Sequence, residues 1–242
     1  MDQHTAQVAT WLRLFIEPGQ VTELRALDVV KKFANGEESY PKVYSGFFDY
    51  DHIDDMAKYA MILSPNAVGV YFVPNPIKTP ILARCKNRIR PAKEKMLASD
   101  KDIDHYKWLL IDADPIRPEG ISSTDEEKQR SWEVIVQVKE YLWALDWSTP
   151  VLADSGNGYH LLYPINQPCT PDGVSKCQSF IQHIADRFDT PDILIDRKVF
   201  NSGRIVKLYG TTSSKGDSTE DRPHRQSKVI ENGTACQQSG IE

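Results

Sequence analysis

Apolar runs that end in polar or turn-forming residues divide the chain into strand and helix candidates. Short apolar runs bounded by turn signals are typical of buried strands, and they occur at 68–73, 108–115, 150–153, 161–163, 193–196 and 204–210. Apolar positions spaced three and four apart predict helices instead, at 5–16, 22–34, 51–63, 125–145 and 171–188. Strands interleaved with helices indicate an α+β or α/β fold.

The ends of these elements carry recognisable signals. Thr5 is suited to cap the first helix, and Ser123 or Thr124 the long helix that starts at Asp125. Residues 1–40 are expected to be an N-terminal helical appendage that carries no chemistry. Residues 41–226 form the predicted main domain, and residues 227–242 a polar tail or linker.

The strand at 108–115 ends in two carboxylates, Asp112 and Asp114. Side chains alternate along a strand, so both point to one side and Ala113 to the other. Two anions at the mouth of a buried strand repel each other and need a counter-charge, and Mg²⁺ or Mn²⁺ prefers carboxylate oxygen. A D-x-D pattern alone is also compatible with a solvated acidic turn, so the choice between a metal site and a turn depends on the rest of the sequence.

Two further blocks supply complementary chemistry. A glycine-rich turn between two apolar runs predicts a tight hairpin, whose backbone N–H groups suit phosphate oxygens; its residues are Ser155, Gly156, Asn157, Gly158, Tyr159 and His160. Asp196 closes another apolar run, and Arg204 and Lys207 follow it with charges suited to a triphosphate. Taken singly, each block has a structural alternative: a plain turn, a core histidine, or an ion pair of Asp196 with Arg197.

Charge is distributed unevenly over the chain. The 242 residues are 40% hydrophobic and carry a net charge of -5, which argues weakly against a nucleic-acid binder. Seven Lys/Arg lie between Lys78 and Lys95 against one acid, and eight lie between Arg197 and Lys228 against three. Such basic faces can hold phosphates or can simply be solvated. From the first face we predict contacts with DNA through Arg84, Lys86, Arg88 and Arg90.

In order and wording, the three blocks resemble the motifs of the archaeo-eukaryotic primase superfamily, the primase-polymerases of phages, plasmids and other mobile elements. The resemblance spans roughly residues 66–226. It implies an α+β fold, with an RRM-like catalytic sheet flanked by helices and a smaller α/β N-terminal unit. It also implies that Asp112, Asp114 and Asp196 bind two catalytic ions, and that Ser155, His160 and Lys207 contact the phosphates of the incoming nucleotide.

Further expectations concern a polar loop, metals, partners and location. The 215–225 run is either a solvated loop or a second contact to the triphosphate or the template, through Arg222, His224 and Arg225. The four cysteines are far apart, so no structural zinc is expected. The expected partners are a single-stranded DNA template, a primer, NTP or dNTP, and a helicase, either fused or separate. With no apolar run long enough for a bilayer, no membrane partner is expected, and the expected location is the cytoplasm.

The sequence therefore predicts template-directed nucleotidyl transfer that makes or extends primers by two-metal catalysis. A metal-dependent nuclease or nucleotide hydrolase is the alternative enzyme, because it would use the same carboxylates. A catalytically silent replication-initiator module that binds DNA is the alternative from another class.

Overall fold

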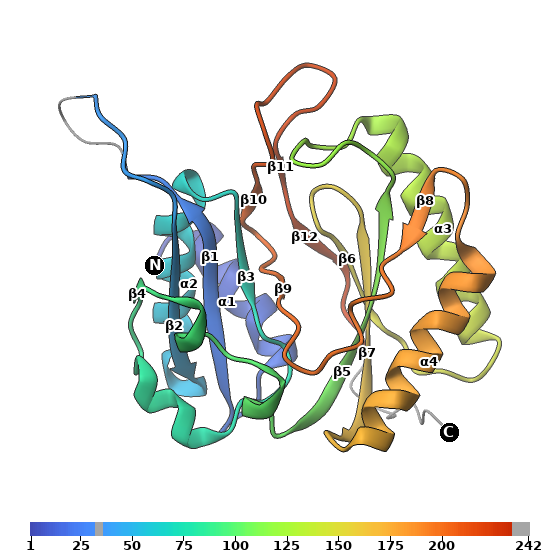
Figure 1. Cartoon of the computed structure of the whole chain (residues 1–242), viewed down its shortest axis with the longest axis horizontal. Coiled ribbons are helices and arrows are strands. Elements are labelled where there is room, and N and C mark those ends of the chain that lie inside the picture. Colours follow the sequence, from blue (N-terminus) through green and yellow to red (C-terminus); the bar gives the residue numbers. More distant parts are fainter. Residues whose placement is uncertain (32–35, 234–242) are drawn as a thin grey trace.

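Two antiparallel five-stranded sheets form the framework of the part that the computed structural model describes, residues 1–31 and 36–233 (Figure 1). The first sheet has the order β4-β2-β1-β3-β9, namely Arg90–Pro91, Lys42–Asp49, Val21–Val29, Gly69–Phe72 and Val206–Lys207. The second has the order β12-β6-β7-β5-β8, namely Lys228–Glu231, Val151–Asp154, Tyr159–Pro168, His105–Pro115 and Ile193–Ile195. A two-stranded ribbon joins β10 (Thr212–Ser213) to β11 (Arg225–Gln226).

Four α-helices flank the sheets. Helix α1 (Gln3–Phe15) packs on α2 (Ile53–Leu63) beside the first sheet, and α3 (Asp125–Trp143) with α4 (Pro171–Phe188) covers the second (Figure 1). Single 3-10 turns lie at Tyr50–His52, Ser64–Asn66, Thr79–Arg84, Glu94–Met96 and Asp100–Asp102. The expected α+β class is confirmed. Among the described residues, no helix combines the length and the apolar character that crossing a membrane requires.

Most expected elements are present, with differences at their ends. The long helix begins after Thr124, whose hydroxyl accepts the backbone N–H of Glu127 in a capping box, as predicted. The first helix begins after Asp2, whose carboxylate accepts the Thr5 N–H, so the prediction that Thr5 caps it was wrong. The run at 204–210 forms only a two-residue strand, β9, and this strand pairs with β3 of the first sheet.

The N-terminal region is not a helical appendage. The 22–34 segment, predicted as a helix, contains most of β1, the central strand of the first sheet; residues 32–34 lie outside the described part. Strand β1 pairs with β2 along its length, so the expected boundary at residue 40 falls inside a hairpin. The tail prediction is also wrong for residues 228–231, which form β12 on the edge of the second sheet; residues 234–242 lie outside the described part.

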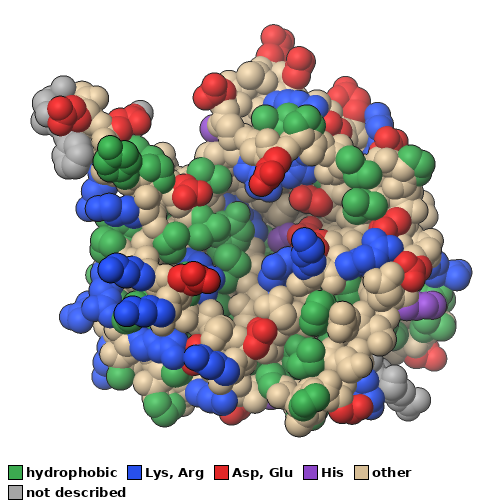
Figure 2. Space-filling model, viewed as in Figure 1, with side chains coloured by type: hydrophobic (Ala, Val, Ile, Leu, Met, Phe, Trp, Pro, Cys, Tyr) green, Lys and Arg blue, Asp and Glu red, His purple; other side chains and the backbone are tan. Residues whose placement is uncertain are grey.

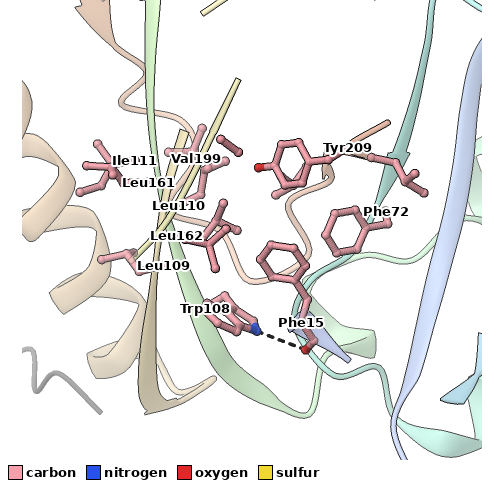
Figure 3. Close-up of a cluster of buried hydrophobic side chains, with 14 of the residues drawn as sticks. Phe15, Phe72, Trp108, Leu109, Leu110, Ile111, Leu161, Leu162, Val199 and Tyr209 are labelled. Atoms are coloured by element: carbon pink, nitrogen blue, oxygen red, sulfur yellow. Dashed lines mark hydrogen bonds between the residues drawn. The ribbon is translucent and has the colours of Figure 1, made fainter. Parts of the chain in front are cut away.

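An apolar layer joins the two sheets at one end of β5. Trp108 meets Phe15 of α1 edge-on, with ring centroids 5.2 Å apart, and donates its indole N–H to the Phe15 carbonyl (Figure 3). Phe72 of β3 and Tyr209 pack on the same Phe15 ring. Because side chains alternate along a strand, Trp108 lies on the same face of β5 as Asp112. The apolar layer therefore closes one end of this face, and the carboxylates lie at the other.

Candidate functional site

Residues of the three sequence blocks come together on neighbouring strands of the second sheet. Ala113 of β5 is paired with Ile195 of β8, and the backbone N–H of Asp196 donates to the Asp112 carbonyl at 2.9 Å. On the other side of β5, Asp112 is paired with His160 of β7. Asp112, Asp196 and His160 therefore lie across from one another on adjacent strands, and Asp114 follows two residues along the same face.

Asp112 is the most strongly perturbed acid of this group. Its side chain is 21% exposed, but its Oδ1 atom is shielded from solvent and has no hydrogen-bond partner. Loss of hydration raises the pKa of this carboxyl well above its usual value, and the charges of Asp114 and Asp196 raise it further. The basic side chain beside Oδ1 is His160, whose Nε2 lies 3.5 Å away. The protein therefore supplies little positive charge to compensate a negative charge on the Asp112 carboxylate.

The other two carboxylates each have a basic partner. Asp114 pairs with Arg117 at 3.3 Å. Asp196 pairs with Arg204 at 2.7 Å and accepts the backbone N–H of Lys198 at 2.8 Å. Two of the three acids are therefore held in place by the chain itself, and only Asp112 lacks such a contact.

This donor set fits a divalent ion in part. Within residues 1–31 and 36–233, no group of three or more His, Cys, Asp or Glu side chains is arranged to hold a metal ion. The unpartnered Oδ1 of Asp112, beside the repelling charge of Asp114, is the kind of oxygen that a hard cation binds, whereas Asp196 would have to turn from Arg204 to join it. Metal binding by Asp112, Asp114 and Asp196 stays a prediction.

The predicted glycine-rich hairpin joins β6 to β7. The left-handed residue of its turn is Gly156 (φ +98°), whereas the sequence pointed to Asn157 and Gly158. Gly158 is needed for a different reason: a Cβ at this position would lie 2.3 Å from the Ala113 carbonyl oxygen. The absence of a side chain lets the hairpin lie directly against the carboxylate strand.

Contacts within and around the hairpin fix its polar side chains. The Ser155 hydroxyl accepts the Gly158 N–H at 3.0 Å. The side-chain oxygen of Asn157 accepts the backbone N–H of Ser123 at 2.9 Å, which ties the hairpin to the segment before α3. Both residues line the same cavity as Asp112, and the structure therefore places the second sequence block beside the first.

His160 combines the two interpretations that the sequence left open. It is buried, as a core histidine would be, and its Nδ1 lies 2.9 Å from the Tyr209 hydroxyl. It also lines the cavity and has Nε2 facing Asp112. Burial lowers the pKa of His160 to about 4, so the ring is neutral at pH 7. Because Nδ1 is hydrogen-bonded to the Tyr209 hydroxyl, Nε2 is the ring nitrogen that faces the cavity.

The opposite wall of the cavity comes from the first sheet. Lys207 of β9 is paired with Tyr71 of β3, and its ammonium group lies 5.5 Å from the centre of the Tyr71 ring. Burial lowers the pKa of Lys207 to about 7, helped by the charge of Lys215, and its Nζ donates to the Thr212 carbonyl. Lys207 of the first sheet thus lines the same cavity as Asp112 and Asp114 of the second sheet.

One cavity accordingly brings together seven of the side chains predicted for catalysis or nucleotide binding, which are Asp112, Asp114, Ser155, Asn157, His160, Arg204 and Lys207. Figure 2 shows acidic and basic side chains next to one another on this face of the molecule. The sequence interpretation missed three polar residues of the lining, Tyr71, Ser213 and Lys215. Lys215 belonged to a basic segment that was recognised, but Tyr71 lies in an ordinary strand pattern and has no local signal.

The structure gives the predicted group at 222–225 other partners. Arg222 forms a two-point ion pair with Glu127, and Arg225 pairs with Asp125. Nε2 of His224 is 2.8 Å from the Gly216 carbonyl. These contacts dock the 215–225 segment on the start of α3, so a direct role of these three side chains in nucleotide binding stays a prediction.

The basic segment of residues 78–95 lies at the edge of the first sheet. Figure 2 shows Lys and Arg side chains gathered at the edge where Figure 1 places β4. Lys86 and Arg88 are exposed, whereas Arg84 pairs with Asp102 through both terminal nitrogens of its guanidinium group. Asp102, the partner of Arg84, is 4% exposed. Arg90 donates to the Arg84 carbonyl. Of the four residues predicted to contact DNA, Lys86 and Arg88 are therefore the two with exposed side chains.

Comparison with solved structures gives several neighbours, two of which are described here. No protein-family model and no curated protein matches the chain. The crystal structure of primase RepB' is similar with a TM-score of 0.45 and 11% identity, over 95% of this chain and 57% of that one. The catalytic domain of primase RepB' in complex with initiator DNA has a TM-score of 0.44 and 11% identity, over 96% of this chain and 86% of its own length.

Both neighbours are primases, the class that the three sequence motifs resemble. This chain spans little more than half of the length of the first neighbour. With TM-scores below 0.5, the likeness assigns neither an activity nor a binding residue to this chain. The functional proposal below rests on the residues themselves.

Proposed function

We propose that this protein is a template-directed nucleotidyltransferase of the primase-polymerase type, which makes or extends primers on single-stranded DNA. The observation that supports this most is the cavity between the two sheets. There, a carboxylate oxygen without a hydrogen-bond partner, on Asp112, shares the cavity with the basic residues Arg204, Lys207 and Lys215 and with a glycine-rich hairpin. A triphosphate and divalent cations together carry the charges that complement such a site.

In the proposed reaction, the 3′-hydroxyl oxygen of the primer attacks the α-phosphorus of an NTP or dNTP. The bond from that phosphorus to its bridging oxygen breaks, pyrophosphate leaves, and the hydroxyl proton passes to solvent. Two Mg²⁺ or Mn²⁺ ions, held by Asp112, Asp114 and Asp196, would supply a more acidic hydroxyl and neutralise the leaving group.

The chain's own side chains bind and orient the nucleotide. His160 is neutral, and in the tautomer with the proton on Nε2 it donates to a phosphate oxygen while Nδ1 is hydrogen-bonded to Tyr209. Arg204 supplies a planar guanidinium next to Asp196. The buried amino group of Lys207 is charged when an anionic phosphate lies beside it, because a nearby opposite charge favours the protonated form.

The test is incorporation of a labelled nucleotide on single-stranded DNA with Mg²⁺ or Mn²⁺, with products sized on a gel. We expect Asp112→Asn to abolish incorporation and to leave the melting temperature unchanged or higher, because it removes a poorly compensated charge. Asp104→Asn is the matched control, since this aspartate precedes the same strand but is exposed, and it should leave synthesis unchanged.

Three results would contradict the proposal. Full incorporation by Asp112→Asn would exclude catalysis at this carboxylate. Degradation of DNA or release of inorganic phosphate without extension would favour the nuclease or hydrolase alternative. Binding of DNA with no metal-dependent reaction would favour the silent initiator module.

A further inference from the structure

Three cationic side chains line the cavity, and two of them already have protein partners. Arg204 pairs with Asp196, and Lys207 donates to the Thr212 carbonyl. Lys215 is the third, and within the described part of the chain its amino group has no hydrogen-bond or ion-pair partner. It is half-buried, whereas Lys207 is 3% exposed, so Lys215 lies nearer to the opening of the cavity.

Lys215 lies in a loop that is fastened at its base to both walls of the cavity. This loop, residues 214–224, joins β10 to β11 and projects at the top of the view in Figure 1, beside the segment that leads into α3. The Ser214 N–H donates to the Val68 carbonyl next to the first sheet at 2.9 Å. One residue earlier, the Ser213 hydroxyl donates to the Ser155 carbonyl of the hairpin at 2.8 Å.

Two further contacts hold the 214–224 loop on either side of Lys215. The Ser122 hydroxyl donates to the carbonyl of Lys215 itself. Next to it, Gly216 has φ +66°, and a Cβ there would lie 2.6 Å from the Gly120 carbonyl oxygen. The backbone at Lys215 is therefore held in contact with the segment before α3, whereas the Lys215 side chain extends into the cavity.

The far end of the loop is anchored by Arg222. Its guanidinium meets both oxygens of Glu127 at 2.8 and 2.9 Å and donates to the Ser122 carbonyl at 2.7 Å. The pair is mostly shielded from water, with 26% and 19% of the two side chains exposed. A two-point ion pair of this kind fixes orientation as well as distance, so Arg222 holds the loop that presents Lys215.

We propose that Lys215 binds the two terminal phosphates of the incoming nucleotide, those that leave as pyrophosphate, and that Arg222 is the positioning residue for it. This rests on the proposed function and names a contact within that site. An ammonium group is a compact charge on a flexible stem, and among the described residues that of Lys215 forms no ion pair, although Asp112 and Asp114 line the same cavity. Its positive charge is felt on both walls of the cavity, since it partly opposes the rise in the pKa of Asp112 and contributes to the low pKa of Lys207.

The test compares nucleotides that differ only in their terminal phosphates. The affinities of NTP, NDP and NMP are measured by calorimetric titration with Mg²⁺ and again with EDTA, for the wild-type protein and Lys215→Met. Loss of a charge-assisted contact should weaken NTP binding about tenfold or more and change NMP binding by less than twofold. Lys215→Arg should retain most of the affinity. Lys176→Met, on the outer helix α4, is the control and should bind as the wild type does.

The positioning role has its own readout. Arg222→Ala should weaken NTP binding in the same direction, and the double variant with Lys215→Met should be no weaker than Lys215→Met alone, because both changes remove one contact. Additive losses would show that Arg222 acts independently of Lys215. Circular dichroism melts of each variant are compared, and a variant that is unfolded at the titration temperature is replaced by Glu127→Gln.

The inference fails if Lys215→Met loses NMP and NTP affinity equally, if it binds NTP as the wild type does, or if it loses affinity for single-stranded DNA instead. These outcomes are separate from failure of the proposed function. A protein that never extends a primer would overturn that function, whereas the titration still reports whether Lys215 recognises terminal phosphates.

Discussion

At the scale of single residues, burial sets the protonation state of the cavity. Asp112, His160 and Lys207 all have pKa values shifted toward the neutral form, and loss of hydration is the largest cause for each. Without a nucleotide, the cavity therefore holds fewer formal charges than its residues suggest. A bound triphosphate with its cations reverses this, because opposite charges favour the ionised forms.

Lys207 gives a testable consequence for stability. Its pKa is about 7 in the folded protein and near 10.5 when unfolded, so between these values the unfolded chain binds more protons and stability rises with pH. From pH 7 to pH 9 the contribution is on the order of 2 kcal/mol. Urea denaturation of the wild type and of Lys207→Met at both pH values measures it, and the variant should lack this part of the rise. An identical pH dependence in the two proteins would contradict the shift.

Individual site residues were predictable where the sequence gives a local pattern. Asp112 and Asp114 end an apolar run, and His160 follows a glycine-rich turn, so residue type and spacing were enough. Tyr71 and Lys215 reach the same cavity from β3 and from the 214–224 loop. No local pattern identifies Tyr71, and the basic segment that contains Lys215 does not distinguish it from its neighbours, because the packing of the two sheets brings these residues to the cavity.

At the scale of elements, the hairpin between β6 and β7 depends on a buried ion pair beneath it. Lys128 of α3 pairs with Asp154, the last residue of β6, and also lies 4.7 Å from the centre of the Tyr159 ring. The same Asp154 accepts the Gly156 N–H, so this carboxylate fixes the start of the turn. Helix α3 thus supports the hairpin from the side away from the cavity.

We therefore predict strong coupling between Lys128 and Asp154. Lys128→Met leaves a buried carboxylate unpaired and should reduce the free energy of unfolding by about 3–5 kcal/mol. Adding Asp154→Asn removes the charge but keeps an acceptor for Gly156, and should restore most of the loss. Urea denaturation of the two single variants and the double variant gives the coupling energy. Additive losses would show that the pair does not act as a unit.

Most of strand β1 was wrongly predicted as a helix, and its buried polar residues explain why. Its apolar residues do not alternate strictly with polar ones, because the strand is central and Thr22 and Glu23 are buried as well. The Thr22 hydroxyl donates to the Val73 carbonyl, and Glu23 is bonded by Ser45 and Arg25. Buried polar residues that are satisfied by distant parts of the chain obscure the period of two, and the remaining apolar spacing resembles that of a helix.

At the scale of the whole molecule, the cavity lies between two sheets, and the basic edge of the first sheet lies outside it. Arg84 and Asp102 form part of the structure at that edge, whereas Lys86 and Arg88 are exposed. The four-residue DNA surface predicted from the sequence therefore divides into a structural pair, Arg84 with Arg90, and a pair that remains available to a nucleic acid.

This division predicts two different outcomes. Replacing both Lys86 and Arg88 by Ala should weaken binding of single-stranded DNA and reduce the slope of log affinity against log salt by about 1.4, at about 0.7 for each lost phosphate contact. Arg84→Ala should instead lower stability, because it leaves buried Asp102 without its partner. Fluorescence anisotropy at several salt concentrations measures the slope. The double variant Lys58→Ala/Lys176→Ala is the control, and an equal slope in both double variants would exclude this DNA path.

The two sheets are also interleaved along the chain, which the sequence did not reveal. Strand β9 pairs with β3, although β3 ends at Phe72 and β9 begins at Val206. During synthesis, the edge of β3 has no partner until the intervening segment of roughly 130 residues has emerged, which takes on the order of 10 s at the rates of translation. For that interval the nascent chain exposes an unpaired strand edge, a known route to aggregation. The yield of folded protein therefore depends on the speed of the ribosome and on any chaperone that covers β3 until then.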